Sequence, residues 1–168
     1  MEQDDRLRDS VVLLLALLLP DGRAIARAMG DQGIATRLCT AGSLSQEVRA
    51  GVGTIVVAEE AMSDQLVGRL VALFEEQPIW SDIPLIILMT PLKDASEGRR
   101  PIGSAASLRN ATFLERPMKI STLLQAVRVA LYGRQKQYRL RDQLRERHQL
   151  LETSERNERR LAAVLNNT

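Results

Sequence analysis

The stretch VVLLLALLL at residues 11–19 places nine apolar residues in a row directly before Pro20. It is too short for a transmembrane helix, which needs about 20 apolar residues. It does not fit a secretory signal peptide, because the chain opens with MEQDD and offers no small-residue cleavage site. An apolar run without polar alternation is typical of a parallel strand that helices cover on both sides. The run therefore predicts a central strand that ends near Leu18.

The same alternation of apolar strand and amphipathic helix continues along the chain. Further strands are expected at 34–40, 54–57, 85–90 and 111–116, with helices after each of them. Ser43 and Gln46 have the spacing of a capping box, and Ser63 can cap a helix at 64–77. The polar stretch before Asn110 allows at most a short helix at 104–109. Alternating strands and helices predict a doubly wound α/β domain with a five-stranded parallel sheet.

Composition limits the remaining possibilities. A chain of 168 residues that is 45% hydrophobic can form one globular core with a helical appendage. The single cysteine, Cys39, excludes an internal disulfide and fits a reducing cytoplasm, where we expect the protein to reside. The basic surplus is local, because residues 133–160 hold nine Lys or Arg against five Asp or Glu.

Five βα repeats in about 120 residues, with strands ending near Leu18, Ala58, Thr90 and Arg116, resemble the receiver domain of two-component response regulators. A working receiver carries two acids after its first strand and an aspartate after its third. These carboxylates hold Mg²⁺, and the aspartate accepts a phosphoryl group. The resemblance therefore implies a flavodoxin-like fold and directs attention to the ends of these strands.

The residues that match those functional positions depart from the family. The acidic pair falls at Ala16 and Leu17, or at Leu17 and Leu18, and the phosphorylated aspartate falls at Ala58. Glu59 is one position away, which places it on the other face of a strand. Thr90 matches the family's hydroxyl residue, and Arg116 replaces its lysine before proline.

These four residues, Ala58, Glu59, Thr90 and Arg116, are thus predicted to form a degenerate phosphorylation site. The resemblance implies a pseudo-receiver with no catalytic residue, no metal and no cofactor.

Three segments resemble one particular group of receiver-like domains. They are PIWSDIPLIILMT, NATFLERPMKISTLLQAVRVAL and GRQKQYRLRDQL. Together they are similar to the receiver-like domain at the start of certain bacterial PAS-containing sensor histidine kinases, and RRLAAVLNNT resembles the first helix of a PAS domain. The resemblance implies a pseudo-receiver at 1–132 and a signalling helix at 133–168. Downstream PAS and kinase modules, or a partner signalling protein, would lie outside this chain, and so would any kinase activity.

The tail beyond Gly133 has no proline and is rich in good helix formers. Its a and d positions alternate in steps of four and three residues, and five of them are leucines: Leu140, Leu144, Leu151, Leu161 and Leu165. A parallel coiled-coil homodimer would bury this stripe, and we expect one. The alternative is a solvated helix that only neighbouring domains order.

We therefore expect a non-catalytic regulatory and dimerisation module of a sensor kinase, independent of phosphorylation, with no membrane contact. The alternative is an RNA-binding antitermination regulator, which the basic tail favours. Only Tyr132 and Tyr138 accompany its arginines, so stacking on bases has little support and a nucleic-acid partner is not expected. A small nucleotide-binding enzyme ranks last, because no G-x-G-x-x-G or P-loop is present.

Overall fold

The computed structural model describes residues 10–15, 19–91 and 108–166. Five parallel strands form one sheet in the order β2-β1-β3-β4-β5. They are β1 (Val12–Leu15), β2 (Thr36–Cys39), β3 (Thr54–Ala58), β4 (Leu85–Met89) and β5 (Ala111–Glu115). This order is the flavodoxin-like form of the doubly wound fold. The expected fold class is confirmed.

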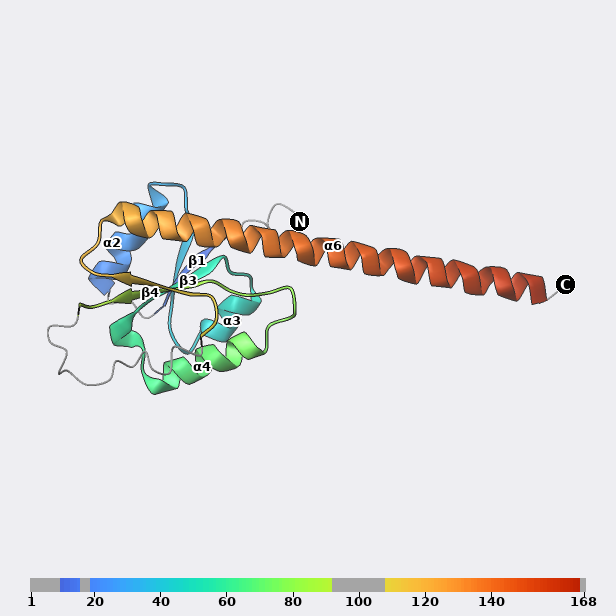
Figure 1. Ribbon diagram of the computed structural model, residues 1–168, viewed down its shortest axis with the longest axis horizontal. Coiled ribbons are helices and arrows are strands. Elements are labelled where there is room, and N and C mark those ends of the chain that lie inside the picture. The colour runs from blue at the N-terminus through green and yellow to red at the C-terminus, as the bar shows by residue number, and fades with distance from the viewer. Residues whose placement is uncertain (1–9, 16–18, 92–107, 167–168) are drawn as a thin grey trace.

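Helices cover both faces of this sheet. They are α2 (Leu19–Gly30), α3 (Leu44–Arg49), α4 (Asp64–Glu75) and α6 (Ile120–Asn166), with a short 3₁₀ turn, η1 (Glu59–Ala61), after β3. Figure 1 shows α2 and the start of α6 on one side of the sheet and α3 and α4 on the other.

The alternate residues of each central strand enter two separate cores. Val12, Leu14 and Val56 pack with Leu123 and Val127 of α6. Their neighbours in the strands, including Leu13, Leu15 and Ile55, pack with the buried leucines of α3 and α4. Successive strand residues point to opposite faces, so burial of both faces requires an unbroken apolar sequence.

The apolar run at residues 11–19 is longer than the strand that it forms. Strand β1 covers Val12–Leu15, and Leu19 already begins α2. The predicted strand end near Leu18 lies outside the described residues.

Serine caps one of the two predicted helices. Ser63 caps α4, because its side-chain oxygen accepts a 3.2 Å hydrogen bond from the backbone N–H of Leu66. The prediction of a capping box at Ser43 is wrong, because the Ser43 side chain makes no capping hydrogen bond to α3. Ser43 precedes α3 with helical angles, φ −92° and ψ −6°, whereas a capping side chain needs an extended residue. Its hydroxyl accepts instead from the backbone N–H of Thr40, at 3.2 Å.

The short helix expected at 104–109 falls mostly outside the described residues, and Leu108 and Arg109 are not helical. Within the parts of the chain that the structure describes, no helix combines the length and the apolar content that a membrane span needs.

Helix α6 is one continuous helix of 47 residues that passes through Gly133 without a break. Its first part packs on the sheet, and the rest extends away from the globular part (Figure 1). Packing continues beyond position 132, because Arg134 and Tyr138 are buried. From Asp142 onward every described residue is exposed. The long C-terminal helix is thus confirmed.

Candidate functional site

The predicted site residues lie together at the carboxyl edge of the sheet. Ala58 ends β3, Glu59 starts η1, Thr90 follows β4 and Arg116 follows β5. Since β3, β4 and β5 are neighbours, these positions meet at one rim, where ligands bind in sheets of this kind. The four residues are called the rim site below.

Glu59 connects η1 to the end of β4. Its carboxylate Oε2 accepts a 2.8 Å hydrogen bond from the backbone N–H of Thr90. Through this hydrogen bond, Glu59 links the turn after β3 to the end of the neighbouring strand β4.

Glu60, which the sequence analysis did not single out, joins the other two polar side chains of the rim. The Thr90 hydroxyl donates to Glu60 Oε1 at 2.9 Å, and Arg116 donates both to the Thr90 hydroxyl, at 2.8 Å, and to Glu60. Arg116 thus forms an ion pair with Glu60. The available signal was the second acid of the EE pair that directly follows β3.

The network stabilises the ionised form of Glu60. Partial burial on its own would raise the pKa of this carboxyl, but hydrogen bonds from its own backbone, Arg116 and Thr90, with the charge of Arg116, outweigh it. The pKa of Glu60 therefore lies below its usual value.

Arg116 is held at the rim by its backbone as well. Its N–H donates to the carbonyl oxygen of Met89 at 2.8 Å, and its Nε lies 3.5 Å from the same oxygen. These two contacts fix the position of Arg116, and its guanidinium points toward Glu60 and Thr90.

The residue at the end of β3 supplies no oxygen ligand to the rim. Ala58 presents a methyl group, and its side chain is buried. Among the described residues, no group of three His, Cys, Asp or Glu side chains is placed to hold a metal ion. A cavity of about 570 Å³ lies beside the rim, and Ile25, Leu88 and Met118 line it together with Arg116.

The five predicted dimerisation leucines all lie on the exposed part of α6. Their exposed fractions range from 43% at Leu144 to 74% at Leu165. By helical geometry, the centre of the stripe lies about 145° around the helix from the side that carries Arg134 and Tyr138. The leucine stripe is therefore not the face with which α6 packs on its own domain.

A second set of residues, absent from the sequence predictions, fastens α6 to the globular part. Arg134 is only 3% exposed. Its Nε donates to the carbonyl oxygen of Val52 at 3.1 Å, and its Nη1 donates to the Ser81 hydroxyl at 2.8 Å. Tyr138 donates to the same Val52 oxygen at 2.9 Å.

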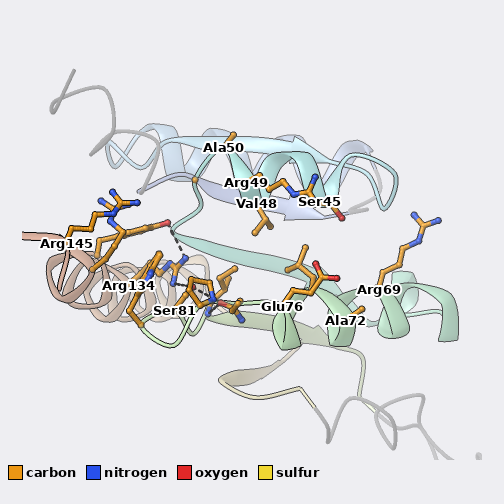
Figure 2. Close-up of a pocket in the computed structure, with 18 residues that line it drawn as sticks. Ser45, Val48, Arg49, Ala50, Arg69, Ala72, Glu76, Ser81, Arg134 and Arg145 are labelled. Carbon is orange, nitrogen blue, oxygen red and sulfur yellow. Dashed lines mark hydrogen bonds between the residues drawn. The ribbon is translucent and has the colours of Figure 1, made fainter. Parts of the chain in front are cut away.

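Figure 2 shows Arg134 and Ser81 at one end of a cavity. Two aromatic rings complete this contact. The Arg134 guanidinium lies 4.5 Å from the centroid of the Tyr138 ring, and Trp80 lies 5.5 Å from Tyr138, centroid to centroid. Arg134, Tyr138, Trp80 and Val52 are called the α6 clasp below. Its sequence signal was the helical spacing that continues the buried face of Leu123 through Arg134 and Tyr138.

Comparisons with solved structures identify the fold. A signal receiver domain of an HD domain-containing protein from Pseudomonas fluorescens superposes with a TM-score of 0.60 at 18% identity, over 79% of this chain and 93% of that one. NtrX from Brucella abortus gives 0.58 at 16% identity over 79% of this chain, which spans 28% of the NtrX chain. A fusion with the yeast Spc42 trimeric coiled coil gives 0.58 at 17% identity, over 86% of this chain and 95% of that one.

The globular part thus has the receiver-domain fold. The sequence matches no family model and no curated protein.

Proposed function

We propose that this chain is a non-catalytic regulatory and dimerisation module of a two-component sensor kinase. It acts without being phosphorylated and passes a signal through α6. The receiver fold supports the two-component context, since several similar structures are described as receiver domains of response regulators or signalling proteins.

The observation that carries the proposal is the continuity of α6. One helix of 47 residues begins in the core, where Leu123 and Val127 pack on the sheet, and continues to an end where its leucines are exposed. Because no loop interrupts α6, a change in how the domain packs on the start of the helix can move the far end of the helix as well. Such a change has an effect only if it shifts the balance between two arrangements of the helix pair.

The rim site supports a role without phosphoryl transfer. Glu59 of the rim site and the adjacent Glu60 already accept hydrogen bonds from Thr90 and Arg116. Phosphoryl transfer needs a carboxylate nucleophile beside a cation that neutralises charge. The residue that ends β3 at this rim is Ala58. In the sequence, the positions that match the acids after the first strand hold Ala16 and Leu17, or Leu17 and Leu18.

An RNA-binding antitermination regulator is the second candidate, because residues 133–160 carry a basic surplus. Two of the nine Lys or Arg residues in this range face the domain, however. Arg134 is buried and the Arg141 guanidinium lies 4.8 Å from the Tyr138 ring centroid. Less positive surface is left for a phosphate backbone, so the dimerisation module is preferred.

The solution mass of the protein tests the proposal. The whole chain is expected at twice its monomer mass of 18.7 kDa. Leu144→Asn combined with Leu151→Asn places two polar groups in the buried seam and is expected to give monomer. Leu150→Asn is the matched control, because Leu150 is 67% exposed but lies off the stripe. The proposal would be contradicted if the wild type were a monomer, or if the control variant and the double variant lost the dimer to the same extent.

A further inference from the structure

A second cavity lies at the opposite edge of the sheet from the rim site. It has a volume of about 650 Å³ and lies between α3 and α4, with α6 at one end (Figure 2). Its size is within the range of sites for small organic ligands. This cavity, which is called the arginine cavity below, is separate from the rim site, because none of the rim residues lines it.

Its charged lining has one dominant sign. Among the described residues that line it, five are arginines and one is a glutamate: Arg49, Arg69, Arg134, Arg141, Arg145 and Glu76. Figure 2 shows Arg69 turned away at the far end, and its guanidinium donates to the Ala41 carbonyl oxygen at 2.9 Å. The remaining arginines come from α3 and α6, on two sides of the cavity.

Two of these cations are held in place by the α6 clasp. Arg134 donates to Val52, Ser81 and Tyr138. The Arg141 guanidinium lies 5.6 Å from the Trp80 centroid and 4.8 Å from the Tyr138 centroid, and its Nε donates to the Asp142 carboxylate at 2.8 Å. The Arg141 side chain is only 17% exposed. Rigid cations lose little side-chain entropy when a ligand binds, which favours affinity.

The other two cations remain available. Arg49 ends α3 and Arg145 lies one helical turn beyond Arg141, and neither side chain makes a hydrogen bond or ion pair with any described residue. Guanidinium groups bind phosphate in a bidentate way, and several of them around one cavity favour a ligand with more than one negative charge.

We propose that the arginine cavity binds a small, multiply charged anion that carries phosphate groups. Arg49 holds it from α3, and Arg141 and Arg145 hold it from α6. The bound anion ties α6 to α3 in addition to the clasp, so it stabilises the docked position of the helix. The proposal goes beyond the regulatory role above and does not depend on dimerisation.

Calorimetric titration of the whole chain with inorganic pyrophosphate at constant ionic strength tests the site. We expect saturable binding tighter than about 1 mM, with a rise in melting temperature as the ligand is added. Arg49→Glu and Arg145→Glu are each expected to weaken binding by about tenfold to a hundredfold. Both residues are exposed, so these substitutions leave the fold intact.

Arg156→Glu is the matched control, because Arg156 is an exposed arginine of α6 that does not line the cavity. It is expected to retain the wild-type affinity. Absence of saturable binding, or equal losses in Arg145→Glu and Arg156→Glu, would overturn the proposal.

A parallel titration with an RNA hairpin separates a free phosphate ligand from a nucleic-acid backbone. The proposal expects RNA binding to be weak and insensitive to Arg49→Glu. Tight, steeply salt-dependent RNA binding that falls equally in Arg145→Glu and Arg156→Glu would assign the arginines to a nucleic acid and overturn it. The mass measurement of the leucine variants is unaffected by either result, so the two proposals fail separately.

Discussion

The hydroxyl of Tyr138 donates a 2.9 Å hydrogen bond to the carbonyl oxygen of Val52, 86 residues earlier in the chain. Val52 lies two residues before β3, and Tyr138 lies in the middle of α6. This bond and the Arg134 contacts fix where along α6 the helix leaves the domain. They therefore set the position of the leucine stripe relative to the globular part.

Removal of that hydroxyl is expected to destabilise the domain. Tyr138→Phe keeps the ring that stacks with Arg134 and removes a buried hydrogen bond, at a cost of about 1–2 kcal/mol in the free energy of unfolding. Tyr132→Phe is the control, because Tyr132 is 58% exposed and its hydroxyl bonds no described residue. Its effect is expected to stay below about 0.5 kcal/mol. Urea unfolding measures both, and equal losses would contradict a structural role for the Tyr138 hydroxyl.

The packing of α6 on the sheet is tested by two valines of the same helix. Val127 is 0% exposed in the core under β1, β3 and β4, whereas Val129 is 62% exposed. Val127→Ala is expected to lower the free energy of unfolding by about 2 kcal/mol, through lost burial and a small cavity. Val129→Ala is expected to have little effect. Similar losses in both variants would show that α6 does not dock on this face.

The rim network predicts a pH dependence of stability. The pKa of Glu60 is lowered in the folded state, so the unfolded state takes up this proton first as the pH falls. Stability from Glu60 is therefore present above its usual pKa of 4.5 and declines as the pH falls through the lower, folded value. Glu60→Gln removes the titratable carboxyl. It is therefore expected to make the free energy of unfolding fall less steeply as the pH is lowered.

Urea unfolding over a pH series measures the Glu60 effect. Glu75→Gln is the control for loss of one carboxylate, since Glu75 is exposed and makes no ion pair with described residues. A wild type and Glu60→Gln with parallel profiles would show that the network does not stabilise the ionised carboxylate.

The sheet could be predicted from the sequence because its pattern is local. Each buried strand appears as an apolar run, and Ser63 marks the start of α4. The continuity of α6 through Gly133 could also be predicted, because good helix formers surround the glycine. Such signals depend on residues within a few positions of one another.

The clasp and the rim network could not be predicted in the same way. A buried arginine looks like a surface residue in sequence, and Arg134 is buried only because Val52 and Ser81 reach it from distant loops. Glu60 was missed for a similar reason, since its partner Arg116 lies 56 residues away. Ser43 failed as a cap because Thr40 competes for its hydroxyl. In each case tertiary contacts decide the outcome.

Reaction with acetyl phosphate tests the central claim most directly, namely that the rim keeps the receiver scaffold but has no phosphoryl acceptor. The whole chain is incubated with acetyl phosphate and Mg²⁺, and its intact mass is measured beside a receiver domain with a complete set of acids. The mass of this chain is expected to stay unchanged while the control gains one phosphoryl group. A phosphoryl gain that Glu59→Gln or Glu60→Gln abolishes would contradict the claim.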